Sequence, residues 1–366
     1  MFIVDDHVHI FQYLGGACGW KSAAAHMAAL QDSMLGAARA DKYGGAGASL
    51  GELPDVNFRV GKFGRFEWNE GGVDYYRQYM PPTLQDQTAS PEFMLAKMDH
   101  AGVDMAVLQN AKVYGKYNDY FAKCIRKYPD RFVGLAEINE LEADKGSEIQ
   151  KLRHAIKDLG LKGIFYGAQK SFGAGTPGGF NNARFDAFWQ EIRDLEIPVH
   201  WSLVGSRMPA ELYMEQMRLF SAWANRFPDI VSVVTQALFA RPFKKNGEVR
   251  FPEELLAIFK KPNVFAEVTY PISAGPLGWD YPYPQFRKLI KQQYEEFGAQ
   301  KMIWGSDIPN VERNCTYKQS LCYLKDYCDF ISPKDMALIL GGNIVQVLKI
   351  EEHAPKTARP RLAGIA

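Results

Sequence analysis

Two histidines near the start of the chain carry the sharpest local signal for chemistry. His7 and His9, in the segment Asp6-His7-Val8-His9, are separated by one residue, so on a β-strand their side chains point to the same side. Two imidazoles that converge at the end of a strand form half of a metal site. A pair of histidines in an arbitrary protein is more often incidental, and its place at the end of a first strand is what favours metal binding here.

A carboxylate near the other end of the chain is the candidate third ligand. Asp307 follows the last apolar strand segment. In a closed barrel of eight strands the first and last strands are neighbours, so Asp307 would lie beside His7 and His9. A carboxylate there can bind a metal and accept a proton from a metal-bound water or a substrate hydroxyl. The alternative is an aspartate that caps the following helix, which the neighbouring glycine and serine would allow.

Eight short apolar segments are the elements that would position these residues. The predicted strands are Phe2–Asp5, Met105–Gln109, Phe132–Glu137, Gly163–Phe165, Val199–Leu203, Ile230–Thr235, Val264–Val268 and Met302–Trp304. Longer helical patterns lie between them, and this alternation predicts parallel strands joined by crossover helices. Eight such units favour an α/β protein of the (β/α)8 TIM-barrel type, as one domain over residues 1–350, over an open doubly wound sheet.

Residues 11–91 do not follow this alternation. They are rich in glycine, aromatic residues, arginine and proline, and a loop of this length without structure would be unusual, so we expect an ordered insertion. It follows the first strand, at the face where barrel enzymes bind substrates. A lid over the site and a contact between subunits are both open interpretations. Residues 351–366 are predicted to form a C-terminal tail.

The composition excludes several classes of protein. The 366 residues include 43 basic and 42 acidic side chains, for a net charge of +1, which argues against a nucleic-acid-binding protein. The chain contains no run of about 18 apolar residues, so no membrane span is predicted. The first residues do not have the pattern of a signal peptide. The five cysteines are odd in number and scattered, so we expect reduced thiols in a cytoplasmic protein.

With these motifs in order along the chain, the sequence resembles the amidohydrolase-related branch of the metal-dependent barrel hydrolases. This branch includes the aminocarboxymuconate-semialdehyde decarboxylases and the resorcylate-type decarboxylases. The resemblance is carried by short segments in matching order and spacing, and it covers most of the chain outside the insertion. These segments are Asp5–His9, Met98–Asp104, Tyr128–Gly134, Gly160–Ile164, Ile197–Val199, Arg226–Asp229, Pro262–Val264, Trp304–Asp307 and Gly341–Asn343.

Two positions depart from the family pattern. Family members usually have a metal-binding histidine where this chain has Ser202, and His200 could replace it only if the strand is shifted or bulged. Family members also have a histidine after the sixth strand, and Gln236, which takes this catalytic position, cannot titrate. The expected ligands of a divalent metal, zinc or manganese, are therefore His7, His9 and Asp307, with His200 as a candidate fourth. A metal-free site is the alternative.

The resemblance implies an enzyme that acts on a small cyclic or aromatic carboxylate by non-oxidative decarboxylation. Asp307 would handle the proton, and Arg241 would clamp the substrate carboxylate unless it is simply a surface arginine. Ser202, Tyr114 and Arg313 are candidate substrate-binding residues on the same face. Aromatic side chains of the insertion would stack on a flat substrate; these are Phe63, Phe66, Trp68, Tyr75 and Tyr76.

Two other functions remain open at this stage. One is hydrolysis of a lactone, a cyclic C–C bond or an amide by metal-activated water. The other is a binding protein that kept the barrel and lost catalysis. In each case the expected partner is a small molecule, with no nucleic acid and no membrane, and the resemblance implies a homodimer.

Overall fold

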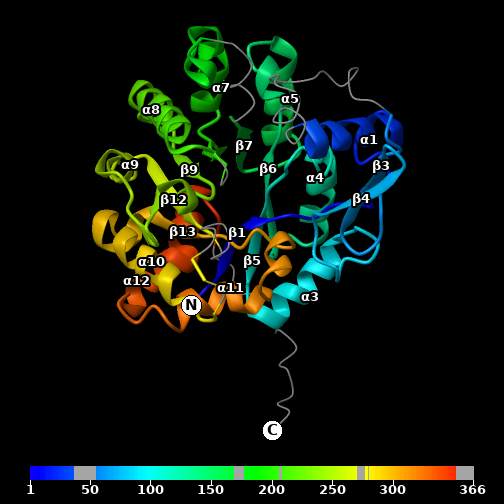
Figure 1. The fold of residues 1–366 in the computed structure, drawn as a ribbon. Coiled ribbons are helices and arrows are strands. Elements are labelled where there is room, and N and C mark those ends of the chain that lie inside the picture. The colour runs from blue at the N-terminus through cyan, green and yellow to red at the C-terminus, as the bar shows by residue number, and fades with distance from the viewer. Residues whose placement is uncertain (37–54, 169–176, 206–207, 270–276, 279, 352–366) are drawn as a thin grey trace.

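Eight parallel strands form the centre of the molecule, in the order β1-β5-β6-β7-β8-β9-β12-β13 (Figure 1). The computed structural model describes residues 1–36, 55–168, 177–205, 208–269, 277–278 and 280–351. The strands are β1 (Val4–Val8), β5 (Met105–Leu108), β6 (Phe132–Ala136), β7 (Gly163–Gly167), β8 (Val199–Ser202), β9 (Ser232–Val234), β12 (Val264–Val268) and β13 (Met302–Trp304). All eight predicted strands are confirmed, and the (β/α)8 barrel is correct.

The first and last strands meet and nearly close the barrel. A parallel bridge joins Val8 to Ile308, just beyond β13. The amide of His9 donates to the carbonyl oxygen of Ile308 at 2.9 Å, and the amide of Asp307 donates to the carbonyl oxygen of His7 at 2.9 Å. The open-sheet alternative is therefore wrong, because these hydrogen bonds join the two edges that an open sheet would leave apart.

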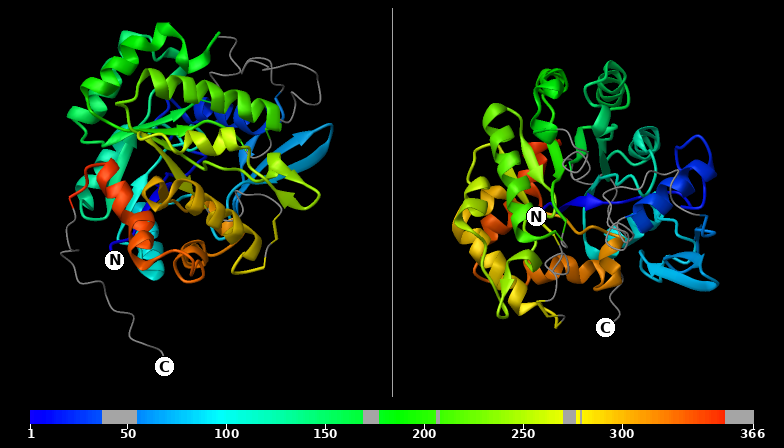
Figure 2. Two further views of the ribbon diagram at one scale, coloured as in Figure 1. Left: turned by 90° about the vertical axis from the view of Figure 1, so that its left-hand side faces the viewer. Right: turned by 45° about the horizontal axis from the view of Figure 1, so that its top comes forward.

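Helices surround the strands in both views of Figure 2. They are α3 (Pro91–Ala101), α4 (Asn118–Lys127), α5 (Gly146–Lys157), α7 (Asp186–Asp194), α8 (Ala210–Arg226), α9 (Glu253–Ile258), α10 (Pro284–Phe297), α11 (Tyr317–Lys325), α12 (Pro333–Ala337) and α13 (Asn343–Val347). Local sequence explains their ends. In α3, for example, the hydroxyl of Ser90 accepts from the amide of Phe93 at 3.1 Å, Pro91 is the first residue, and Gly102 ends the helix with a φ of 85°.

Short helical turns complete the connections between these elements. They are η1 (Asp32–Gly36), η2 (Glu140–Glu142), η3 (Gly179–Asn181), η4 (Ala183–Phe185), η5 (Arg241–Phe243), η6 (Ala299–Lys301), η7 (Asn310–Arg313) and η8 (Leu338–Gly342). A small hairpin of β10 (Lys244–Lys245) and β11 (Glu248–Val249) follows η5. The described helices include none with both the length and the apolar character needed to span a membrane.

Apolar side chains fill the interior of the barrel at the end away from the strands' carboxyl ends. Val4, Met105, Val133, Val233 and Ile303, from five different strands, belong to one buried cluster. Side chains of α13 join this cluster and cover the end of the barrel that lies away from the strands' carboxyl ends. The interior is thus a core rather than a pore, and it supports the polar residues that lie above it.

The described part of residues 11–91 contains a helix and a small sheet. The helix α1 (Ala23–Gln31) is capped by Ser22, and the strands β2 (Arg59–Val60), β3 (Arg65–Glu70) and β4 (Val73–Gln78) form an antiparallel sheet. The strands β3 and β4 extend from one side of the barrel (Figures 1 and 2). Residues 37–54 of the predicted insertion, and all but the first residue of the predicted tail 351–366, lie outside the described residues.

The carboxylate of Asp5 links the first strand to the segment that follows the last one. Its Oδ1 accepts from the amides of His7 and Ser306, at 3.0 and 2.9 Å. Its Oδ2 accepts from the hydroxyls of Ser306 and Tyr317, at 2.5 and 2.8 Å. Because Asp5 is fully buried, no water can replace these four bonds if the carboxylate is removed.

We expect Asp5→Ala to lower the free energy of unfolding by about 3 kcal/mol, because it leaves buried donors without an acceptor. Asp5→Asn is the matched control. Its amide oxygen can accept from the two backbone amides, and its amide nitrogen can donate to the two hydroxyl oxygens, so the loss should be clearly smaller. Denaturant unfolding of the three proteins measures both values. Equal losses for the two variants would contradict this account of the closure.

Candidate metal centre

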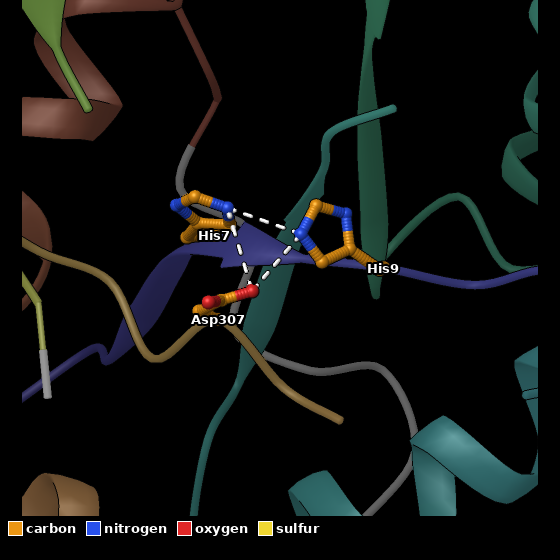
Figure 3. A group of neighbouring side chains, drawn as sticks. All are labelled: His7, His9 and Asp307. Atoms are coloured by element: carbon orange, nitrogen blue, oxygen red, sulfur yellow. Dashed lines mark hydrogen bonds and ion pairs between the residues drawn. The ribbon is translucent and has the colours of Figure 1, made fainter. Parts of the chain in front are cut away.

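His7, His9 and Asp307 converge at the mouth of the barrel (Figure 3). The Nε2 atoms of the two histidines are 3.1 Å apart. Oδ1 of Asp307 lies 3.1 Å from Nε2 of His9 and 3.8 Å from Nε2 of His7. All three residues are buried. The convergence expected from strand alternation and barrel closure is therefore present in the structure.

The outer nitrogens of the two imidazoles are held by acceptors. Nδ1 of His9 lies 2.8 Å from the carbonyl oxygen of Gln109, which can only accept, so Nδ1 carries the proton. Nδ1 of His7 lies 2.9 and 3.1 Å from the two oxygens of Glu267 and donates in the same way. In the neutral rings both Nε2 atoms therefore point lone pairs at each other and at Asp307. Such an arrangement could hold a cation at its centre.

The geometry of these donors fits a divalent metal. Ligands bound to zinc at about 2.0–2.2 Å lie about 2.8–3.6 Å from their neighbours in tetrahedral or octahedral arrangements. The observed separations of 3.1 to 3.8 Å are close to that range. Two imidazoles and a carboxylate suit zinc or manganese, and both outer nitrogens are oriented by an acceptor, as is usual for metal-binding histidines.

Electrostatics supports the same conclusion. Burial alone would lower the pKa of His7, but the charges of Glu267 and Asp307 outweigh it and raise that pKa to about 9. Burial alone would raise the pKa of Asp307, but the hydrogen bond from His9 and the charges of both histidines lower it. At neutral pH a proton therefore occupies the cluster whenever no other cation does.

His200 does not join the converging donors. Its Nε2 lies 2.9 Å from Oδ1 of Asp6, and both residues are fully buried inside the barrel. Burial raises the pKa of Asp6 although His200 opposes this. The expected route to a fourth ligand required a shifted or bulged β8, but β8 pairs in regular register with both neighbours. The irregularity lies in β1 instead, between Asp5 and Val8.

The two positions that depart from the family pattern both lie near the centre. Nε2 of Gln236 donates to Oδ2 of Asp307 at 3.1 Å, and its backbone amide donates to Glu267 at 3.2 Å. Gln236 therefore orients the carboxylate through a group that does not titrate. Ser202, at the end of β8, lines the cavity described below.

Tyr114 and Arg313 lie beside the centre. The ring of Tyr114 is 4.7 Å from that of His9, and Nδ2 of Asn310 donates both to the Tyr114 hydroxyl, at 2.8 Å, and to Asp307, at 3.1 Å. Burial raises the pKa of Tyr114, the charge of Asp307 adds to this, and the charge of Arg313 opposes it. Arg241 is exposed at the start of η5, and no contact among the described residues joins it to the three ligand candidates.

A cavity of about 330 Å³ opens at the carboxyl ends of β5, β6, β7 and β8, at the same end of the barrel as the centre, and its lining does not include His7, His9 or Asp307. It is lined by Trp20, Ala29, Asp32, Ser33, Tyr79, Asn110, Ala111, Lys112, Val113, Glu137, Glu140, Phe165, Gly167 and Ser202. Tyr79 lines the cavity; burial raises the pKa of its hydroxyl, and the charge of Asp307 raises it further. Residues of α1, η1 and the segment after β4 thus form one wall of a pocket.

The aromatic side chains expected to stack on a substrate are not the ones found here. Phe63, Tyr75 and Tyr76 are exposed, Phe66 is fully buried, and Trp68 stacks on Tyr75 within the β3–β4 hairpin. None of these five lines the cavity. The β3–β4 hairpin extends outward from the barrel, whereas Trp20 and Tyr79 are the aromatic residues of the insertion that line the cavity.

Several important residues were missed at the sequence level. Glu267 is the clearest, since a single acidic residue inside the apolar strand Val264–Val268 is a signal that the strand faces something polar. Asn310, three residues after Asp307, and Tyr79 and Asn110 carry no comparable signal in the sequence. Their roles depend on contacts between distant segments.

A barrel with one histidine in its first strand, a second just beyond it and an aspartate after its last strand is the architecture of metal-dependent hydrolases and their decarboxylating relatives. The sequence model of the amidohydrolase family matches residues 4–350, so the chain belongs to this family. The resemblance inferred from the short motifs is therefore confirmed.

Solved structures with the same fold include three informative neighbours. A probable 2-pyrone-4,6-dicarboxylic acid hydrolase from Acinetobacter baumannii, with citric acid bound, is 18% identical, with a TM-score of 0.58 over 95% of this chain and 100% of that one. A 2,6-dihydroxybenzoate decarboxylase from Rhizobium is 16% identical, with a TM-score of 0.57 over 96% and 100%. A dihydroxybenzoic acid decarboxylase from a Polaromonas species, with bound manganese and 2-nitroresorcinol, is 16% identical, with a TM-score of 0.50 over 71% and 86%.

We expect Glu267→Gln to weaken metal binding about 10- to 100-fold, because His7 loses the carboxylate that orients its ring and strengthens its Nε2 as a ligand. Glu253→Gln, at an exposed position in α9, is the control and should bind metal like the parent. Competition with a chelator of known affinity measures both. Unchanged affinity in Glu267→Gln would contradict the assigned role.

Metal affinity should rise with pH. Because the pKa of His7 is about 9 in the metal-free cluster, metal must displace one proton at pH 6 to 8. The apparent affinity should therefore increase about tenfold per pH unit in this range. Calorimetric titrations in buffers with different heats of ionisation should show release of about one proton per metal. An affinity that does not change between pH 6 and pH 8 would disprove this linkage.

Proposed function

We propose that His7, His9 and Asp307 bind one divalent metal, zinc or manganese, and that the protein catalyses non-oxidative decarboxylation of a small cyclic or aromatic carboxylate. The observation that carries the proposal is the convergence of three lone pairs at the end of the barrel where a cavity with aromatic walls opens. A bound divalent cation supplies Lewis acidity that polarises the substrate carboxylate and a neighbouring oxygen. The membership of the amidohydrolase family supports the same class of chemistry.

Asp307 is the residue that would move the proton. In decarboxylation the electron pair of the bond to the carboxylate passes to the ring carbon, carbon dioxide leaves, and that carbon takes up one proton. The lowered pKa of Asp307 keeps its carboxylate ionised, so its oxygens are free of a proton when a substrate hydroxyl approaches; it would take up that proton and then deliver it to the carbon. Asn310 and Gln236 hold its two oxygens in place throughout.

Residues near the centre and the cavity would orient the substrate. Tyr114 packs against His9, and Arg313 lies close enough to influence the hydroxyls of Tyr79 and Tyr114. Both arginines are exposed, but Arg313 acts on these two hydroxyls and is therefore the better-placed cation for a substrate carboxylate, with Arg241 as the second candidate. Ser202 offers a hydroxyl at the cavity wall.

Hydrolysis is the alternative chemistry for such a centre. It needs a base for water and usually an acid for the leaving group. The position that would carry this acid holds Gln236, which cannot donate a proton in an acid–base sense. Decarboxylation needs only one group that carries a proton, and Asp307 is such a group.

The proposal predicts release of carbon dioxide when the metal-loaded protein is incubated with a panel of hydroxybenzoates and related cyclic acids. His7→Ala and Asp307→Asn should each lower kcat/KM by about 10³-fold or more, since they remove a ligand and the proton carrier. His154→Ala and Asp158→Asn, which change an exposed histidine–aspartate pair in α5 and just after it, are the matched controls and should retain activity. Gas detection combined with chromatography of the ring product measures the reaction.

Other outcomes would distinguish the remaining functions. Ring opening of a lactone without carbon dioxide would replace decarboxylation by hydrolysis. Tight binding of a cyclic acid with no turnover in the metal-loaded protein would indicate a binding protein on the same barrel. Full activity in a chelated, metal-free preparation would disprove the metal mechanism while leaving the fold intact.

A further inference from the structure

Strand β4 is the longest strand edge left uncovered by the described residues. The barrel strands are joined nearly into a ring, and the hairpin of β10 and β11 has strands of only two residues. β4 lies at the edge of its sheet, pairs with β3 over all six residues without a bulge, and extends from the side of the barrel (Figures 1 and 2). Edge strands are commonly protected by lysine, proline or a bulge, and β4 has none of these.

The backbone groups of alternate β4 residues point away from β3. In β3, the carbonyl oxygen of Arg65 accepts from Gly61 and the amide of Asn69 donates to Val56, both on the side where β2 lies. Backbone groups alternate in direction along a strand, so the even-numbered residues of β3 face β4 and the odd-numbered residues of β4 face β3. The outward groups of β4, which no hydrogen bond among the described residues reaches, belong to Asp74, Tyr76 and Gln78.

The side chains of β4 resemble those of a paired strand. Val73, Tyr75 and Tyr76 are 52%, 45% and 59% exposed. Valine and tyrosine favour strands that have neighbours, and tyrosine is enriched in protein interfaces. The guanidinium of Arg65 lies 4.4 Å from the centre of the Tyr76 ring, and Asp74 is on the same face of the sheet as this ring. A cation and an anion thus lie beside one uncovered edge.

The outward backbone groups select how two copies of β4 can pair. When two identical strands pair antiparallel about a two-fold axis, one residue lies opposite itself. With Tyr76 at the axis, Asp74 of each copy lies opposite Gln78 of the other, and every outward amide and carbonyl group of both strands is paired. With Tyr75 at the axis, Gln78 would lie opposite Gly72, which has a φ of 78° in the turn. The register centred on Tyr76 therefore makes more hydrogen bonds.

The same register makes the charges of the two copies complementary. Asp74 of one copy is the diagonal neighbour of Tyr76 in the other, where the guanidinium of Arg65 lies over the ring. The two-fold axis forms this pair of opposite charges twice. On the opposite face Arg77 lies across from Tyr75 of the second copy, so no like charges meet.

We propose that β4 pairs antiparallel with β4 of a second copy of this chain, centred on Tyr76, and that the two three-stranded sheets join into one sheet of six strands across a homodimer. The described hairpin of the insertion is then a contact between subunits. Because Tyr79 follows β4 directly and lines the cavity, this contact also supports one wall of the cavity. The proposal does not depend on the proposed reaction.

Analytical ultracentrifugation of the full-length protein over a range of concentrations tests the pairing. The parent should be a dimer, and Tyr76→Pro should be a monomer at concentrations where the parent is dimeric. Proline removes the outward amide of the central pair and leaves the hydrogen bonds between β3 and β4 in place, because the amide of Tyr76 does not point to β3.

Two charge reversals test whether the partner is a second copy in this register. Asp74→Arg and Arg65→Asp should each raise the dissociation constant of the dimer about tenfold or more, since each brings two pairs of like charges together across the axis. An equimolar mixture of these two variants should recover the parent's affinity, because both pairs in the mixed dimer again have opposite charges. Glu248→Arg and Arg250→Asp change an exposed ion pair at the other hairpin, and these controls should dimerise as the parent does.

Three results would overturn the proposal: a parent that is monomeric at every concentration, a dimer that persists in Tyr76→Pro, or single charge variants whose mixture does not recover the dimer. If Tyr76→Pro does not fold, the charge variants and their mixture still decide the question. Circular dichroism and thermal unfolding of each variant show whether a lost dimer reflects the interface or the fold.

Discussion

The closure of the barrel between β1 and the segment after β13 is the constraint on which the metal centre depends. His9 and Asp307 are 298 positions apart in the chain, yet each is anchored in the same seam by a backbone hydrogen bond. Gly305 is needed there, because a Cβ atom would lie 2.8 Å from Cβ of His7 and 3.0 Å from Cδ of Glu267. The donor atoms are therefore held by sheet geometry rather than by flexible loops, which favours a preorganised site.

Much of the fold was predictable because the strongest patterns are local. Buried parallel strands are short and apolar on both faces, so their positions can be found from the sequence, and their number predicts the barrel. Once the barrel is assumed, its closure brings Asp307 to His7 and His9 without any other information. The structure of the insertion was harder to predict. The outward direction of β3 and β4 is set by packing and not by the aromatic content of the strands.

The rest of the site depends on features that the sequence does not encode locally. The pairing of β1 is irregular between Asp5 and Val8, and Asp6 in this stretch contacts His200 of β8. Strict strand alternation does not predict the contact between Asp6 and His200. It places His200 on the same side of its strand as Ser202, so His200 was a candidate ligand. Glu267 comes from a strand remote in sequence, and its contact with His7 requires the register between neighbouring strands to be known.

The replacement of a titrating residue by Gln236 constrains the chemistry of the centre. A histidine beside Asp307 could exchange protons with it, whereas the amide of Gln236 donates to Oδ2 at every pH. Gln236 therefore fixes the orientation of Asp307 without carrying a proton itself. A reaction that must take a proton from water and give one to a leaving group needs two such carriers, or one that acts twice. A reaction that exchanges a carboxylate for a single proton needs only Asp307, and the proposed decarboxylation rests on this difference from hydrolysis.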